Sequence, residues 1–341
     1  MEKIINEIIE NISKSVEKKG RFVQFNDKDY KPVEISKDNF KIIEGEGEGR
    51  IAFIDGGNSE ILKASNFSLQ LIRVYYCIYE NNKRVKGEKH EFYVLVYAEN
   101  KGHDIVYNVK TFGTDLSFNE FNSFDKTLSQ GEHRVEVSSI GEAVRKFAEI
   151  DLMHDLIGLL SKGDVIVRDG DLQSTITGEQ ERYDKVFEKA YEKGVIIAGL
   201  SKTSQLFTDS GNSAVETINS ISPEGAWLYH PVARIENKKH KAEMSFVKLN
   251  EKSRYVLRFE LYIKQKEDMK NVLILLKQNS KDPVFLGYPY GLIEADKFAR
   301  VSNQEKQYLL IRFMTKSGDN WKKISAYLNT VNAHSILDNL S

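Results

Sequence analysis

Two aspartates in similar local sequences stand out as residues that could do chemistry. Asp55 lies in the stretch RIAFIDGGNSE and Asp169 in DVIVRDGDL, and each follows an apolar run and precedes a glycine. Asp-Gly is also a common turn pair, so either stretch alone is explained by the end of a strand. Because the pattern recurs, we expect two strands of one sheet to bring both carboxylates to the same end. Like charges placed together usually share a bound cation, so the pair predicts a metal site.

A third acidic ligand is expected from a helix between these two strands. The segment 138–163 has apolar residues at helical spacing and contains Glu142, Glu149 and Asp151. Glu142 falls in the first turn, where the helix dipole already explains an acid. Glu149 is flanked by residues expected in the core, where a charge needs a partner. We therefore expect Glu149 to be the third ligand, with Asp151 as the fallback.

Later residues could complete this site. The stretch LIEADKFAR offers Glu294 and Asp296 as a fourth carboxylate. Asp296 is favoured because it shares a helical face with Leu292 and Ala299, whereas Glu294 is expected to face away from it. Such oxygen ligands suit Mn²⁺ or Mg²⁺, and a cluster of them can hold two ions about 4 Å apart. Lys202, in the polar turn GLSKTS, would place a positive charge where a phosphate reacts.

The order of the predicted elements indicates how these residues could meet. Three antiparallel strands are predicted, at 50–55, 67–81 and 90–100, the last two separated by a turn-like segment at 82–89. A helix, the strand that carries Asp169, a helix near 178–193 and a strand at 194–200 follow. This is the order of an α/β fold of the ribonuclease-H-like type, in which helices flank a mixed sheet. Its first and fourth strands are neighbours, so Asp55 and Asp169 could face one metal.

Length and composition predict one globular body. The chain has 341 residues, of which 29% are charged and 40% hydrophobic, and only five prolines and no linker-like stretch interrupt it. We expect a single domain over residues 1–341. Within it we expect an N-terminal helix at 1–20, a ribonuclease-H-like core with insertions at 50–314, and a C-terminal helix at 320–341.

Several classes of protein are excluded by the sequence. The longest aliphatic run, residues 272–276, is too short to cross a membrane, and the N-terminus has helical periodicity with acidic residues and not the pattern of a signal peptide. We therefore expect a cytoplasmic protein. The single cysteine, Cys77, excludes an internal disulfide and a cysteine-based zinc cluster. A formal net charge of −1 gives no overall attraction to nucleic acid, so any DNA-binding surface must be local.

Five stretches form an ordered series that resembles the motifs of the NurA family of archaeal and bacterial nucleases. They are FIDGGNSE, RKFAE, VIVRDGDL, GLSKTS and GYPYGLIEADKFAR, and they span residues 51–300. The resemblance implies a ribonuclease-H-like fold and a homodimer that encloses a channel for DNA. It implies Mn²⁺-dependent 5′ to 3′ exonuclease and single-strand endonuclease activity. It also implies partnership with the hexameric ATPase HerA, a DNA translocase, during end resection.

The resemblance also assigns roles to single residues of this chain. The acids that match the family's metal ligands are Asp55, Glu149 and Asp169. Lys202 matches the motif lysine, and Tyr288 matches the tyrosine of the Tyr-Pro motif.

Two positions depart from the family pattern. Asp296 stands eight residues after Tyr288, where the family often has histidine. Aspartate can ligate a metal directly, but the role of a histidine as proton donor cannot be assumed for it. Asp171 stands where a small hydroxyl residue is common and adds a negative charge. His334, in NAHSILD, is expected to be a helix-surface or interface residue and not a ligand.

Two other functions remain open at this point. A sugar kinase or an actin-like ATPase, both phosphotransferases, also places phosphate loops after strands that end in Asp-x-Gly. Such a protein would need a glycine-rich adenosine loop, and the sequence after Gly225 has only isolated glycines. A catalytically silent DNA-binding scaffold subunit would keep the fold, but it would have no need for Asp55, Glu149 and Asp169 together.

Overall fold

The computed structural model describes residues 1–16, 20–129 and 131–329, and its central feature is an 11-stranded sheet. Two further strands, β1 (Tyr30–Pro32) and β11 (Ala233–Ile235), pair with each other outside it. The strands of the large sheet are β2 (Phe40–Ile42), β3 (Arg50–Lys63), β4 (Phe67–Glu80), β5 (Lys83–Lys101), β6 (Asp104–Phe112), β7 (Phe121–Asn122), β8 (Val165–Asp169), β9 (Ile196–Ser201), β10 (Trp227–Tyr229), β12 (Ala242–Lys248) and β13 (Leu257–Tyr262). The α-helices are α1 (Glu2–Val16), α2 (Val137–Leu159), α3 (Glu179–Lys193), α4 (Ala214–Asn219), α5 (Met269–Asn279), α6 (Tyr290–Ala299), α7 (Asn303–Ser317) and α8 (Asn320–Asn329).

The middle of the sheet has the ribonuclease-H-like strand order. Strands β5, β4, β3, β8 and β9 are consecutive neighbours. The first three are antiparallel, whereas β8 runs parallel to β3 and β9 parallel to β8. Strands β6 and β7 extend one side of this core, and β13, β12, β10 and β2 extend the other. The expected α/β fold, with β3 and β8 side by side, is therefore confirmed.

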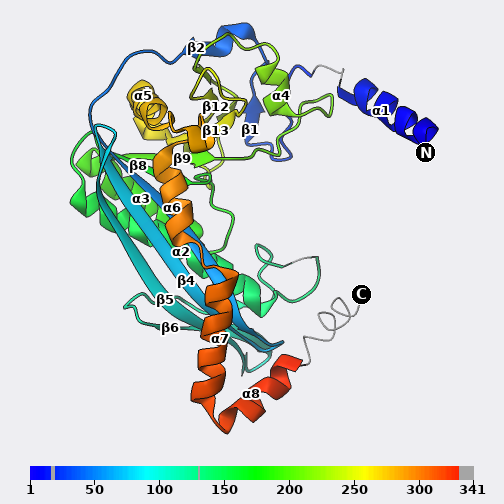
Figure 1. Cartoon of the computed structure of the whole chain (residues 1–341), viewed down its shortest axis with the longest axis vertical. Coiled ribbons are helices and arrows are strands. Elements are labelled where there is room, and N and C mark those ends of the chain that lie inside the picture. Colours follow the sequence, from blue (N-terminus) through cyan, green and yellow to red (C-terminus); the bar gives the residue numbers. More distant parts are fainter. Residues whose placement is uncertain (17–19, 130, 330–341) are drawn as a thin grey trace.

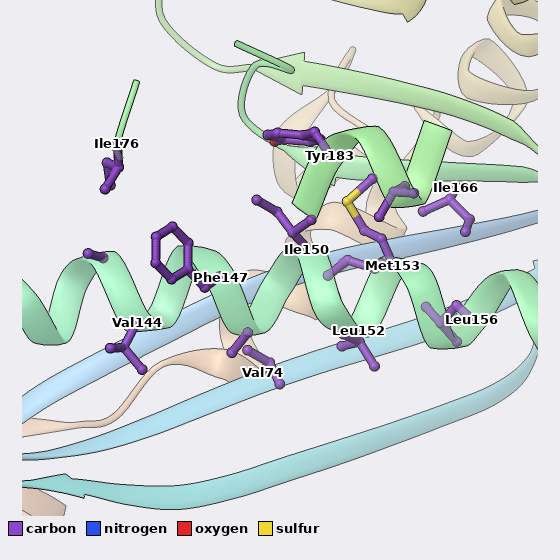
Figure 2. Packing of buried hydrophobic residues seen from close by; sticks show 14 of the residues in the cluster. Val74, Val144, Phe147, Ile150, Leu152, Met153, Leu156, Ile166, Ile176 and Tyr183 are labelled. Carbon is purple, nitrogen blue, oxygen red and sulfur yellow. The ribbon is translucent and has the colours of Figure 1, made fainter. Parts of the chain in front are cut away.

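Helices cover both faces of the sheet because side chains alternate along each strand. Ala52, Ile54 and Ile166 pack in the cluster under α2 and α3, whereas Phe53 and Val167 pack in the cluster under α5 and α6. Figure 1 shows α6 and α7 in succession along one face of the long strands, with α2 and α3 on the opposite face. Figure 2 shows the α2 face, where Val144 and Leu152 point towards the strands and Ile150 and Met153 point towards α3 and Tyr183. The same alternation directs Asp55 and Asp169 to the α6 face and Arg168 to the α2 face.

Two boundaries differ from the expectation. β3 does not end at Asp55 but continues to Lys63, and it pairs with β4 along this length apart from an irregularity between Glu60 and Leu62. Gly56 and Gly57 stay in the strand instead of forming a turn. Of the predicted turn segment 82–89, residues 83–89 are the beginning of β5. The hairpin turn is the pair Asn81 and Asn82, whose φ angles of 49° and 62° suit a two-residue turn.

The two chain ends are only partly described. The predicted helix 1–20 is present as α1, and residues 17–19 lie outside the described residues. The predicted helix 320–341 is present as α8 to residue 329, and the rest of it, with His334, lies outside the described residues. None of the described helices is both long and apolar enough to cross a lipid bilayer.

α6 approaches β3 closely because Gly291 leaves room for the ring of Phe53. A Cβ atom at position 291 would lie 2.0 Å from a carbon of that ring. Phe53 is fully buried in the cluster under α5 and α6. This contact sets the height of α6 above the strand that carries Asp55.

We expect Gly291→Ala to destabilise the protein, although alanine is the better helix former by about 1 kcal/mol. The added methyl group overpacks the contact with Phe53, and overpacking costs about 1–3 kcal/mol. Denaturant unfolding should therefore show a lower free energy of unfolding. Gly158→Ala is the matched control, because a Cβ at that exposed position of α2 meets nothing within 4 Å. The control should be neutral or stabilising, and equal losses in the two variants would contradict the packing argument.

Candidate metal centre

Three carboxylates from three elements converge beside the end of β8. Asp55 comes from β3, Asp169 is the last residue of β8, and Asp296 comes from α6. One oxygen atom of each lies within 4.8 Å of the others. All three line a cavity of about 420 Å³. The parallel pairing of β3 with β8, and the position of α6 over the same face, explain why residues so distant in sequence meet.

Lys202 and Tyr288 lie against this group. Lys202 Nζ is 2.7 Å from Asp169 Oδ2 and 3.3 Å from Asp296 Oδ1, and it stands 5.3 Å from the centre of the Tyr288 ring. Tyr288 is fully buried, and no group among the described residues is aligned for a hydrogen bond with its hydroxyl. Burial, together with the charges of Asp169 and Asp55, raises the pKa of this hydroxyl far above its usual value. It therefore stays protonated and can donate.

Glu149 approaches from the α2 face of the sheet. Its Oε2 accepts a hydrogen bond of 3.0 Å from Arg168 Nε and forms an ion pair with Arg168 Nη2, also at 3.0 Å, and its Oε1 is paired with Arg145. The side chain of Glu149 is only 1% exposed. The structure thus places Glu149 beside the three-carboxylate group but not in it, and its role as a ligand stays a prediction.

Two glycines of β3 let helices on opposite faces of the sheet come close to this strand. A Cβ atom at Gly56 would lie 2.4 Å from Glu149 Oε1, and one at Gly57 would lie 2.3 Å from the carbonyl oxygen of Ala299 in α6. Any larger side chain would therefore push α2 or α6 away from β3. Close approach, and not a turn, explains why glycines follow Asp55.

The edge of β3 is open where these contacts occur. The last registered pair between β3 and β8 is Ile54 with Arg168, so β3 continues past the end of β8 without that partner. The carbonyl oxygen of Gly56 accepts a hydrogen bond of 3.1 Å from Arg145 Nη1 instead. α2 thus supplies both a cation and an acid at the gap.

Of these carboxylates, Asp55 is the one whose negative charge is least balanced by neighbouring cations and hydrogen-bond donors. Its Oδ1 accepts a hydrogen bond from the backbone N–H of Gly56, at 2.7 Å. Burial, followed by the negative charges of Asp169 and Glu149, raises the pKa of Asp55 to about 8. Burial also raises the pKa of Asp169, although Lys202 opposes the shift. Three acidic oxygen donors, of which Asp55 has no cationic partner in contact among the described residues, fit a hard divalent cation such as Mn²⁺ or Mg²⁺.

The other candidate acids do not join the group. Asp151, the fallback ligand, is paired with Arg182 of α3, whose Nη1 lies 2.6 Å from its Oδ1. Glu142 is exposed in the first part of α2. Asp171 accepts a hydrogen bond from the backbone N–H of Gln173 at 3.3 Å, which is a local turn contact.

Glu294 was expected to face away from the buried side of α6, and the structure shows the reverse. Its side chain is 7% exposed and accepts from Tyr75 at 2.6 Å, Tyr79 at 2.7 Å and Arg84 at 2.6 Å. The side chain of Asp296 is 36% exposed and lines the cavity. The apolar periodicity of α6 missed this polar cluster because its partners come from β4 and β5. Glu294 is therefore a structural acid and cannot serve as a neutral control for Asp296.

Three arginines at the site were not predicted: Arg145, Arg168 and Arg300. Arg145 stands four residues before Glu149, which is the spacing of a helical ion pair. Arg168 precedes Asp169, so strand alternation directs it to the opposite face from that carboxylate. Arg300 follows Asp296 at the helical spacing and binds it at 3.0 Å. These spacings were present in the sequence and could have identified the arginines.

Comparison with known proteins gives one family and one shared fold. The family model of the NurA domain matches residues 49–301. No curated protein matches the sequence. The crystal structure of the NurA nuclease from Sulfolobus solfataricus is similar at a TM-score of 0.53 and 13% identity, over 93% of this chain and 95% of that chain. The catalytic domain of human endonuclease V gives a TM-score of 0.41 and 11% identity, over 77% of this chain and 85% of that chain.

We expect cation binding to strengthen as the pH rises towards 8 and then to level off. A cation needs the charged form of Asp55, whose pKa is about 8, so binding below that pH must displace a proton. The dissociation constant for Mn²⁺ should rise up to about tenfold for each pH unit below the pKa. Calorimetry at pH 7 in buffers of different ionisation enthalpy should detect the released proton.

Asp55→Asn supplies the control for this pH dependence. Without a cation, the folded protein holds the Asp55 proton more tightly than the unfolded chain, whose pKa is near the ordinary value of 3.8. The free energy of unfolding of the wild type should therefore fall as the pH rises from about 4 to about 8. Asp55→Asn should lose that part of the slope and should bind Mn²⁺ weakly. A wild-type affinity that is independent of pH between 6 and 8 would contradict the assignment.

Proposed function

Because this chain belongs to the NurA family, we propose that it is a metal-dependent nuclease that hydrolyses phosphodiester bonds in DNA. The observation that carries the proposal is the convergence of Asp55, Asp169 and Asp296 on one cavity. Family membership favours this function over the alternative of a sugar-kinase or actin-like phosphotransferase.

We assign the metal ligands from the same contacts. Asp55, Asp169 and Asp296 would hold Mn²⁺ or Mg²⁺ through carboxylate oxygens. A bound cation would supply an activated water and positive charge for the leaving oxygen of the phosphodiester. We further propose a two-ion site in which Glu149, whose charge helps to raise the pKa of Asp55, is the further ligand.

Two more residues are assigned roles at this site: Lys202 balances negative charge, and Tyr288 orients Asp169. Although burial lowers it, the charges of Asp169 and Asp296 raise the pKa of Lys202, so this side chain stays cationic. Lys202 can therefore neutralise charge on a phosphate at the cavity. Tyr288 is buried behind Lys202 and keeps its proton, so we assign it as a positioning residue for Asp169.

The finer activity follows the family resemblance. We propose 5′ to 3′ exonuclease and single-strand endonuclease activity during the resection of DNA ends. A hexameric DNA translocase of the HerA type would be the partner that feeds the duplex to the nuclease. Membership of the NurA family supports these assignments.

We also propose a homodimer in which α1 contributes to the interface. α1 has no buried residue, so it does not pack on the core of its own chain. Its exposed apolar side chains lie on one face of the helix, and they are Ile4, Ile5, Ile8, Ile9, Ile12 and Val16. Figure 1 shows α1 projecting away from the sheet. An apolar stripe of this kind is typical of a helix that packs on another chain.

Each of Asp55→Asn, Asp169→Asn and Asp296→Asn should lower DNA cleavage by more than about a hundredfold, because each removes an acidic ligand. The assay uses end-labelled single-stranded and double-stranded DNA with EDTA, Mg²⁺ or Mn²⁺. Cleavage by the wild type should require the cation. Full activity in the Asp55 or Asp169 variant would contradict the proposed site.

The control for this assay is Glu142→Gln, which changes an exposed acid of α2 away from the cavity. This variant should cleave like the wild type. A wild-type protein that binds DNA but cleaves it with none of the cations would instead be the silent scaffold subunit, and the nuclease proposal would fail.

The dimer is tested by Ile5→Glu combined with Ile8→Glu and Ile12→Glu. Charges on the apolar face should shift sedimentation from dimer to monomer, because burying them in an interface is unfavourable. Asn6→Glu with Ser13→Glu places charges on the polar face of the same helix and should leave the dimer intact. An unchanged dimer in the isoleucine variant would exclude α1 from the interface.

A further inference from the structure

Arg145 lies at the wall of the cavity and has few contacts. Its side chain is 22% exposed and lines the cavity together with Asp55, Asp169 and Asp296. Among the described residues, its Nη1 donates to the carbonyl oxygen of Gly56 and to Oε1 of Glu149. Arg145 is therefore held by one acid and one carbonyl, at a surface that a substrate can reach.

Glu149 has a second arginine that is fixed much more firmly. The side chain of Arg168 is 7% exposed and binds Glu149 Oε2 at 3.0 Å. Its Nη1 also donates to the carbonyl oxygen of Asp171 at 2.7 Å and to the hydroxyl oxygen of Tyr183 at 2.9 Å. Arg168 alone can thus balance the charge of Glu149, so Arg145 is the dispensable partner of that carboxylate.

A divalent cation would change the balance of charge at this site. Three of the four carboxylates already contact cationic side chains, which are Lys202, Arg300, Arg145 and Arg168. A cation held by Asp55, Asp169 and Asp296 would add positive charge next to Arg145. The cation and the guanidinium group of Arg145 repel each other, and an anion bound between them would relieve this repulsion. The position of Arg145 then favours an incoming anion.

We propose that Arg145 is a phosphate-binding residue for the DNA strand, paired with Glu149 in the cation-free protein and released to a phosphate when a divalent cation occupies the site. This inference rests on the proposed nuclease function. The planar guanidinium group donates two parallel hydrogen bonds to phosphate oxygens, which suits it to this role. Lys202 is less available, because two carboxylates already hold its single ammonium group.

The inference predicts that Arg145 strengthens DNA binding only when a cation is present. A fluorescein-labelled single-stranded oligonucleotide is titrated with protein in EDTA and in Ca²⁺, a cation with the same preference for oxygen ligands. Fluorescence anisotropy gives the affinity, and a gel shows that the strand is intact. Arg145→Gln should weaken binding about tenfold in Ca²⁺ and less than about twofold in EDTA, as expected for one charge-assisted contact.

Cation binding supplies a second readout with the opposite sign. The positive charge of Arg145 repels a cation in the cavity, so Arg145→Gln should bind Mn²⁺ at least as tightly as the wild type in calorimetry. An arginine that only holds Glu149 in place would give weaker Mn²⁺ binding when it is removed. Lys146→Gln is the matched control, because it removes a positive charge from the next residue of α2, which does not line the cavity. It should match the wild type in both measurements.

The outcomes separate this inference from the function on which it rests. Equal losses of DNA affinity in EDTA and Ca²⁺, no loss in Ca²⁺, or weaker Mn²⁺ binding by Arg145→Gln would each overturn the role of Arg145. A wild type that binds neither Mn²⁺ nor DNA would overturn the nuclease proposal itself. Thermal unfolding of Arg145→Gln shows whether the variant is folded, and Arg145→Lys, which keeps the charge, should retain part of the affinity gained in Ca²⁺.

Discussion

Repulsion between buried carboxylates is the constraint on which the rest of this site depends. Burial, followed by the negative charges of Asp169 and Glu149, raises the pKa of Asp55 to about 8. Acids in such positions stay charged only if cations balance them or if they bind a metal. The fold meets this requirement with cationic side chains from α2, from β8, from the end of α6 and from the turn after β9. Each of these segments ends or passes beside the same gap in the sheet.

The gap itself follows from unequal strand lengths. β8 ends at Asp169, whereas β3 continues to Lys63, so one edge of β3 loses its partner just where Asp55 lies. Gly56 and Gly57 have no side chains to fill the space, and α2 and α6 enter from opposite faces. A strand that ended at Asp55, as the sequence suggested, would have provided the carboxylate but not the route by which Glu149 approaches it.

Much of this arrangement could be predicted from the sequence, because it depends on patterns within single elements and on their order along the chain. Repeated apolar runs ending in Asp-Gly predicted the two strands, and the order of elements predicted that β3 and β8 are neighbours, which the structure confirms. The path of β3 and the burial of Glu294 were missed, because both depend on partners distant in sequence. Glu294 looks exposed on a helical wheel, yet Tyr75 and Tyr79 of β4 surround it. Periodicity within one element does not reveal polar groups that another element supplies.

The negative charge of Asp296 must be balanced by cations around it. A neutral histidine, which the resemblance to the family implies for this position, would add no charge. Asp296 adds a negative charge, and two cations contact it: Lys202 at 3.3 Å and Arg300 at 3.0 Å. Lys202 also contacts Asp169, and the charges of both acids raise the pKa of this lysine against the effect of burial. The substitution thus replaces a group that could donate a proton with one that increases the attraction for a metal, and it makes the charged state of the site depend more strongly on a bound cation.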